Sequence, residues 1–229
     1  MTQPDWWYDD LKQVGLDFAD EAQVATYDER QGSTVAEARR LLMRLGVGPS
    51  TALADIGCGT GLLTCEAAGM ARRVRAIDIS GAMLDAARRR AEAQRLRHIA
   101  FEQAGFLTFA ASADLDRSVA KNALHHLPDM WKAVALTRMR DALKPGGRLY
   151  IRDVAFNCGP DAIPRTVESW IGHMTRDSGY SRADVATHVR EEHSTFAWIL
   201  ERLITEAGFR LISREHEGVY AEFVAEAVA

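Results

Sequence analysis

A glycine-rich stretch, Asp55-Ile56-Gly57-Cys58-Gly59-Thr60-Gly61, is the densest group of residues suited to chemistry in this chain. Glycines at alternate positions permit positive φ angles and let a ligand approach the backbone closely. A helix that begins after Gly61 would direct its free N–H groups at an anionic group. The stretch therefore predicts a turn that binds a ligand through the main chain.

Asp78 provides a second signal, because it ends the next predicted strand, 17 residues after Gly61. In nucleotide-binding α/β folds, an acid at this place accepts hydrogen bonds from ribose hydroxyls. The alternative is a glycine turn and a strand-end aspartate with no ligand. The dinucleotide fingerprint G-x-G-x-x-G would need its third glycine at position 62, where the chain has Leu62. The spacing therefore argues against a nicotinamide dinucleotide.

The elements that must position these residues follow from hydrophobic periodicity. Strands are predicted at 52–56, 74–79, 99–103, 115–120 and 148–156, with helices at 33–45, 60–68, 82–93 and 130–143 between or before them. This alternation indicates a parallel sheet with helices on both faces. Helices at 162–176, 182–191 and 195–207 follow, and strands at 209–215 and 219–225 predict an antiparallel hairpin.

The pattern G-x-G-x-G with Asp55 ahead of it resembles the first motif of class I S-adenosylmethionine-dependent methyltransferases. Asp78-Ile79-Ser80 followed by Met83-Leu84 resembles their second motif. Residues 122–129 resemble the segment after the fourth strand in small-molecule and quinone-type members, and residues 143–147 resemble the turn before the fifth strand. The resemblance covers roughly residues 33–156 and 194–226.

The resemblance implies an α/β fold, a Rossmann-like three-layer sandwich. Its mostly parallel seven-stranded sheet would carry the antiparallel C-terminal hairpin and a helical cap. We expect one domain over residues 1–229. Its parts are an N-terminal helical lid segment (1–50), a cofactor-binding core (51–156), a helical cap insertion (157–193), and a C-terminal helix and hairpin (194–228).

The cofactor implied by the resemblance is S-adenosyl-L-methionine, with S-adenosyl-L-homocysteine as product. The residues that the resemblance assigns to it are Asp55, Gly57, Cys58, Gly59, Thr60, Gly61, Asp78, Ile79, Met83, Ala104, Gly105, Phe106, Asn122 and Tyr27. Members often carry an aspartate in the loop after the third strand, but residues 103–107 contain no carboxylate. Adenine recognition would therefore rest on backbone groups and Phe106. For Cys58, the alternative is a small residue that fits the turn.

The candidate catalytic residues are His125 and His126, which fall beside the expected methyl-transfer site. Imidazole titrates near neutral pH, so either could act as a general base or bind the acceptor. The alternative is a histidine that only structures its loop. Asp153 is a third plausible group near the acceptor.

The N-terminal segment is rich in aromatic residues, namely Trp6, Trp7, Tyr8, Phe18 and Tyr27. In similar methyltransferases such a segment folds over the cofactor, and a tyrosine approaches the methionine carboxylate. Tyr8 and Tyr27 are the candidates here. The alternative is that the aromatic side chains pack on the sheet edge.

The composition and motifs of the chain limit the kinds of partner that we expect it to bind. The chain has 28 basic and 32 acidic residues, a net charge of −4, which argues against nucleic acid as a partner. No Asp/Asn-Pro-Pro-aromatic motif follows the fourth strand and no Pro-Cys dipeptide occurs, so base-methylating enzymes are disfavoured. Glu191-Glu192-His193 lacks metal-ligand spacing, and no C-x-x-C occurs, so we predict no metal.

The longest apolar run has five residues, whereas a membrane span needs about 20, and the acidic N-terminus does not resemble a signal peptide. We therefore expect a cytoplasmic protein without a membrane partner. The predicted function is direct, in-line methyl transfer from S-adenosylmethionine to a small-molecule acceptor. A non-catalytic S-adenosylmethionine-binding protein and an NAD(P)-dependent oxidoreductase are the alternatives. The oligomeric state stays open, with a homodimer among the options.

Overall fold

The computed structural model describes residues 4–12 and 21–228, so residues 13–20 of the expected lid segment, Phe18 included, lie outside the described residues. The strands are β1 (Ala52–Ile56), β2 (Arg73–Asp78), β3 (Ile99–Gln103), β4 (Leu115–Lys121), β5 (Leu143–Phe156), β6 (Thr195–Phe196), β7 (Phe209–Glu217) and β8 (Tyr220–Ala227). The helices are α1 (Glu21–Arg30), α2 (Val35–Arg44), α3 (Leu62–Ala68), α4 (Gly81–Ala93), α5 (Asp129–Ala142), α6 (Ile163–Asp177), α7 (Arg182–Glu191) and α8 (Ala197–Glu206), with short 3-10 turns at Leu124–His126 and Pro160–Ala162.

The main sheet has the strand order β3-β2-β1-β4-β5-β8-β7. Strands β1 to β5 run parallel to one another, whereas β8 is antiparallel to both β5 and β7. The chain crosses from β3 at one edge to β4 beside β1, which creates a switch point at the carboxyl ends of β1 and β4. The mostly parallel sheet with a C-terminal antiparallel hairpin is confirmed.

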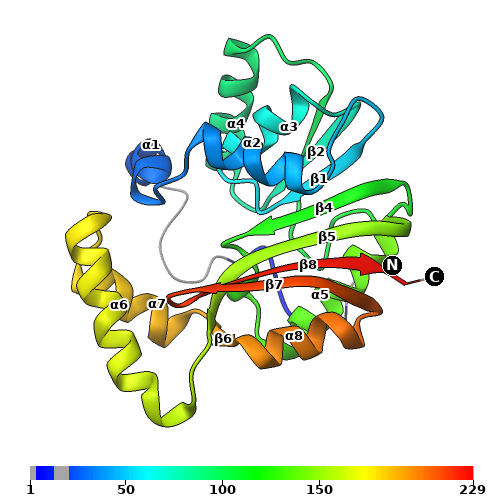
Figure 1. The fold of residues 1–229 in the computed structure, drawn as a ribbon. Helices are drawn as coiled ribbons and strands as arrows, with labels where there is room; N and C mark the ends of the chain where they lie inside the picture. The colour runs from blue at the N-terminus through cyan, green and yellow to red at the C-terminus, as the bar shows by residue number, and fades with distance from the viewer. Residues whose placement is uncertain (1–3, 13–20, 229) are drawn as a thin grey trace.

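Two apolar layers cover the sheet because its strands alternate their side chains between faces. Ala52 and Ala54 of β1 belong to the core that α5 and α8 complete, and Leu53 between them packs with residues of α2 and α3. Figure 1 shows α2, α3 and α4 on one side of the sheet and α5 and α8 on the other. The glycine-rich turn therefore leaves a strand that is buried on both faces.

Helices α6 and α7 form a cap at the end of the sheet where β5 terminates (Figure 1). Val154 and Phe156 of β5 share a third apolar cluster with Trp170 and Ile171 of α6 and Val185 of α7. The predicted helical insertion is therefore confirmed as helix. None of the helices in the described ranges is long and apolar enough to cross a membrane.

Most boundaries differ from the prediction by one or two residues, and two of the differences have an identifiable cause in strand pairing. Strand β5 starts at Leu143, five residues early, because Leu143 pairs with Leu115 ahead of a register shift in the β4–β5 ladder. Helix α8 starts at Ala197, because residues 195–196 pair with residues 155–156 as the short strand β6. Both differences come from pairing with distant strands, which local periodicity does not report.

Candidate functional site

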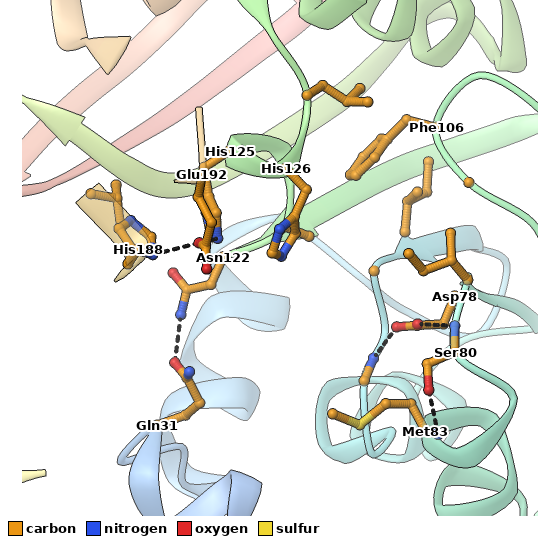
Figure 2. Close-up of a pocket in the computed structure, with 18 of the residues that line it drawn as sticks. Gln31, Asp78, Ser80, Met83, Phe106, Asn122, His125, His126, His188 and Glu192 are labelled. Atoms are coloured by element: carbon orange, nitrogen blue, oxygen red, sulfur yellow. Dashed lines mark hydrogen bonds and ion pairs between the residues drawn. The ribbon is translucent and has the colours of Figure 1, made fainter. Parts of the chain in front are cut away.

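One pocket lies at the carboxyl ends of the parallel strands and extends beneath the cap. Figure 2 shows its two ends: Asp78, Ser80 and Met83 lie at one, and His125, His188 and Glu192 at the other. The predicted residues that line it are Tyr8, Tyr27, Gly57, Gly59, Asp78, Ile79, Met83, Ala104, Gly105, Phe106, Asn122, His125 and His126. The loops after β1 to β4 thus converge on one cavity, as open α/β sheets arrange them.

The turn after β1 depends on its glycines. Gly57 has a φ of +74°, and a Cβ at this position would overlap the Cβ of Ala123. The N–H groups of Gly57 and Cys58 both donate to the carbonyl oxygen of Ile77, at 2.8 and 3.0 Å. The turn is therefore held against β2, and the absence of side chains leaves its backbone open to the pocket.

Asp78 holds two parts of the site together. Its Oδ2 accepts a hydrogen bond from the Gly59 N–H at 2.8 Å, and its Oδ1 accepts one from the Ser80 N–H at 2.9 Å. Burial raises the pKa of this carboxyl above its usual value, while these backbone donors oppose the rise. Asp78 therefore links the glycine turn to the start of α4, with its carboxylate at the pocket wall.

The loop after β3 receives a carboxylate from the N-terminal segment. Asp10 is buried, and its Oδ2 accepts a hydrogen bond from the Leu107 N–H at 2.6 Å. A Cβ on Gly105 would overlap this carboxyl group. Sequence reasoning correctly found no acid within the loop, but it missed Asp10, which lines the same pocket from 95 residues away in the chain (105 minus 10).

Replacing Asp10 with alanine should lower the free energy of unfolding by about 1–3 kcal/mol, because the buried Leu107 N–H loses its acceptor. Urea unfolding followed by circular dichroism measures this change. Asp5→Ala is the matched control, since Asp5 is an exposed residue of the same segment, and should change stability by less than about 0.5 kcal/mol. Equal stabilities for the two variants would show that the contact does not anchor the segment.

Four residues predicted to bind the cofactor lie outside the pocket wall and instead support the turn. Asp55 accepts a hydrogen bond from the Thr64 hydroxyl at 2.6 Å, and burial raises its pKa to about 6. The Thr60 hydroxyl donates a hydrogen bond to Asp28 at 2.5 Å, and the Cys58 Sγ lies 3.7 Å from the Gly59 carbonyl oxygen. Gly61 packs against Ala87 of α4. The sequence motif thus contains residues that shape the turn as well as residues that face the cavity.

His125 is buried between two carboxylates. Its Nδ1 forms an ion pair with Asp153, and its Nε2 lies 3.0 Å from Glu192 Oε2. Burial alone would lower the pKa of His125, but Asp153 and Glu192 outweigh that effect and raise it to about 10. Asp153 pairs with the Nδ1 of this ring and is not among the residues that line the pocket, so its place beside an acceptor stays a prediction. The arrangement agrees with the alternative that His125 structures its loop.

His126 lies between the two ends of the pocket, nearer to Phe106 than His125 is (Figure 2). Burial, together with the neighbouring His125 ring at 4.4 Å, lowers the pKa of His126 to about 3. Its imidazole is therefore neutral at physiological pH. The Tyr8 hydroxyl donates a hydrogen bond to the His126 carbonyl oxygen at 3.3 Å.

Some of the N-terminal aromatic residues pack on the body of the protein, and others line the pocket. Trp7 packs against Trp131 of α5, with ring centroids 4.9 Å apart, whereas Trp6 is 69% exposed. Tyr8 and Tyr27 both line the pocket, and the Tyr27 ring lies over Gly59. The segment therefore packs on a helix and also closes one side of the cavity.

A bridge of polar side chains joins α1 to the cap over the pocket. The Asn122 amide donates to Gln31 Oε1 at 3.1 Å, and the Gln31 amide donates to the Tyr180 hydroxyl at 3.0 Å. Arg30 pairs with Asp184 of α7 at 3.4 Å. Asn122 has a φ of +53°, a conformation that asparagine tolerates better than most residues. The bridge fixes the roof of the cavity from three separate segments.

Sequence reasoning missed most of the wall that the cap provides. These residues are Trp170, Met174, Tyr180, Val185, His188 and Glu192, and Tyr220 of β8 lies in the same wall. One local signal was present: His188 and Glu192 are four residues apart, which places them on one face of a helix. The His188 Nδ1 lies 2.5 Å from Glu192 Oε2. The cap end of the pocket is thus built mainly from the inserted helices.

The chain is similar in sequence to known methyltransferases. Residues 53–147 match a family described as a methyltransferase domain. An uncharacterized methyltransferase of Geobacillus kaustophilus is 28% identical over 188 residues, which span 81% of each chain.

Two solved structures share the fold. A SAM-dependent methyltransferase from Aquifex aeolicus superposes with a TM-score of 0.66 at 16% identity, over 91% of this chain and 99% of that one. The N-methyltransferase NodS from Bradyrhizobium japonicum, in complex with S-adenosyl-L-homocysteine, gives a TM-score of 0.59 at 22% identity, over 84% and 86% of the two chains. Residues 53–147 thus match a methyltransferase domain in sequence, and most of the chain has a fold similar to that of S-adenosylmethionine-dependent methyltransferases.

Proposed function

We propose that this protein transfers the methyl group of S-adenosylmethionine directly and in line to a small-molecule acceptor. The observation that carries this proposal is the continuity of one pocket. It joins the glycine turn and Asp78 at one end to His126 and the cap at the other. A cofactor held at the first end would meet an acceptor held at the second without leaving the cavity.

The residues at the first end suit the cofactor in type and position. The Asp78 carboxylate is the group that would hold the ribose hydroxyls, and the open backbone of Gly57 and Gly59 would accommodate the methionine part. Met83 and Phe106 offer apolar surfaces for the adenine ring. When bound, S-adenosylmethionine supplies a methyl group on a sulfonium, which is a good leaving group.

The protein's own task would be to orient the acceptor and exclude water. We assign the orienting role to His126, because its neutral imidazole lines the pocket between the two ends. A group with a pKa of about 3 is too weak a base to remove a proton at neutral pH, so His126 would position the acceptor by hydrogen bonding. Trp170 and Tyr180 of the cap would close the cavity above the acceptor.

The first test of this function compares ligands by thermal unfolding. At a concentration of about 100 times its Kd, a ligand stabilises the folded state by about 2.7 kcal/mol. For a chain of this size S-adenosylhomocysteine should raise the Tm by about 5–10 °C, and NAD should leave it unchanged. Stabilisation by NAD alone would instead support an oxidoreductase.

The second test follows the methyl group itself. The protein is incubated with S-adenosylmethionine labelled in its methyl group and with panels of quinones, phenols and small acids. Transfer of label to one acceptor class is the expected result. Binding of S-adenosylhomocysteine without transfer to any acceptor would favour the non-catalytic alternative.

A further inference from the structure

A cluster of two histidines and one glutamate lies at the cap end of the pocket. The Nε2 of His125, the Nδ1 of His188 and the Oε2 of Glu192 all lie within 4.8 Å of one another. The same carboxylate oxygen is 3.0 Å from the first nitrogen and 2.5 Å from the second. All three residues line the cavity, and Figure 2 shows them grouped apart from Asp78.

Each imidazole of this cluster is fixed from behind. Asp153 binds the Nδ1 of His125, and the Ser194 hydroxyl lies 2.8 Å from the Nε2 of His188. The Asp153 carboxylate in turn accepts hydrogen bonds from the His125 and Val154 N–H groups, at 3.1 and 2.7 Å. A partner on the far ring nitrogen is the arrangement that orients histidine ligands in metalloproteins.

We propose that His125, His188 and Glu192 bind one divalent first-row transition-metal ion, with Zn²⁺ as the reference ion. Two imidazoles and one carboxylate are a known zinc ligand set that leaves one coordination position open. Bonds of ~2.0–2.1 Å in a tetrahedral site place ligand atoms about 3.3 Å apart. The Glu192 oxygen lies 3.0 and 2.5 Å from the two nitrogens, somewhat closer than that value, so small side-chain rotations would form the site.

The ligand types also select among cations. Mg²⁺ and Ca²⁺ prefer oxygen ligands, whereas two imidazole nitrogens favour Zn²⁺, Co²⁺ or Ni²⁺. Binding would replace the proton that the His125 imidazolium directs at Glu192, and this proton would pass to solvent. His188 would bind through Nδ1 as the neutral tautomer that carries its proton on Nε2, toward Ser194. The far nitrogens would keep Asp153 and Ser194 as partners. Sequence spacing predicts no metal here because His125 lies far along the chain from the other two ligands.

The open position would face the pocket, since all three ligands belong to its wall. If the proposed methyl transfer holds, an acceptor with a hydroxyl or carboxylate oxygen fits that position, and this part of the inference rests on the proposed function. Metal binding does not depend on it. The two ideas are therefore tested by separate measurements.

The test titrates chelator-treated full-length protein with Co²⁺, followed by visible absorption, and then with Zn²⁺ in calorimetry. We expect one ion per chain and displacement of Co²⁺ by Zn²⁺. His188→Ala and Glu192→Gln should each weaken Zn²⁺ binding by at least ~10–100-fold. Loss of a residue that only hydrogen-bonds to a metal ligand already causes a loss of that size, and these two residues are ligands themselves. Tm values measured without metal establish that each variant is folded.

The matched control is His173→Ala. His173 and Asp177 on α6 form the same four-residue histidine–carboxylate pair, but both side chains are exposed and lie outside the cluster. This variant should bind Zn²⁺ like the parent protein. Failure of the parent protein to bind Co²⁺ or Zn²⁺ stoichiometrically would overturn the proposal, as would equal affinities in the control and the two cluster variants. Methyl transfer plays no part in either outcome.

Discussion

Asp78→Ala should weaken the binding of S-adenosylhomocysteine by about 10- to 100-fold. A hydrogen bond between a charged group and a ligand hydroxyl contributes ~1.5–3 kcal/mol, and each 1.4 kcal/mol is about tenfold in affinity. The substitution also removes the acceptor of the Gly59 and Ser80 N–H groups. Loss of these contacts would loosen the glycine turn, so the effect on affinity should reach the upper part of this range.

Isothermal titration calorimetry measures this effect directly. Asp85→Ala is the matched control, because Asp85 is an exposed acid on α4, the helix that follows Asp78, and its partner is Arg88. The control should bind with parental affinity. Unchanged affinity in Asp78→Ala would refute the assignment of Asp78 to the cofactor, provided that both variants unfold cooperatively in urea.

Gly61→Ala should lower the free energy of unfolding by about 2–5 kcal/mol. Gly61 has a φ of +77°, where an L-residue costs ~1–2 kcal/mol. A Cβ there would lie 2.6 Å from the Ala87 Cβ and 3.0 Å from its Cα. Overpacking of this kind costs ~1–3 kcal/mol, because the α4 backbone itself must move.

Urea unfolding monitored by circular dichroism gives this value. Gly159→Ala is the control, because Gly159 has a φ of −72° and no heavy atom lies within 4 Å of its Cβ position. The control should remain within about 0.5 kcal/mol of the parent protein. A Gly61 variant as stable as the control would contradict the close contact between the start of α3 and α4.

Local sequence pattern was sufficient for most of the fold. Both bounds of β1, of β3 and of α7 match the predicted ranges, because apolar runs and breaker residues delimit these elements. The start of β5 and the short strand β6 were not, because both exist only through pairing with strands elsewhere in the chain. Propensity within a short window carries no information about such partners.

The two ends of the pocket differ in how far the sequence predicts them. The Asp78 end comes from motifs that are contiguous in sequence, and most of their residues line the cavity. The exceptions are residues such as Asp55 and Gly61, which support the turn from behind. A motif records both kinds of residue alike, because the turn needs both.

The cap end could not be assembled from sequence. Trp170 and Glu192 approach this end from segments whose packing is decided by tertiary contacts, as Asp10 approaches the loop after β3. The histidine pair after β4 was identified, but its two members differ in environment: His125 lies between carboxylates, and His126 faces the cavity. Burial and neighbouring charge, which the sequence does not reveal, separate their roles.

A crystal structure of the protein grown with S-adenosylhomocysteine tests the central claim most directly. We predict one molecule in the pocket, with its ribose hydroxyls on the Asp78 carboxylate, its methionine part over Gly57 and Gly59, and its sulfur directed toward His126. Density for the ligand at any other place, or an empty pocket at saturating ligand concentration, would contradict the account.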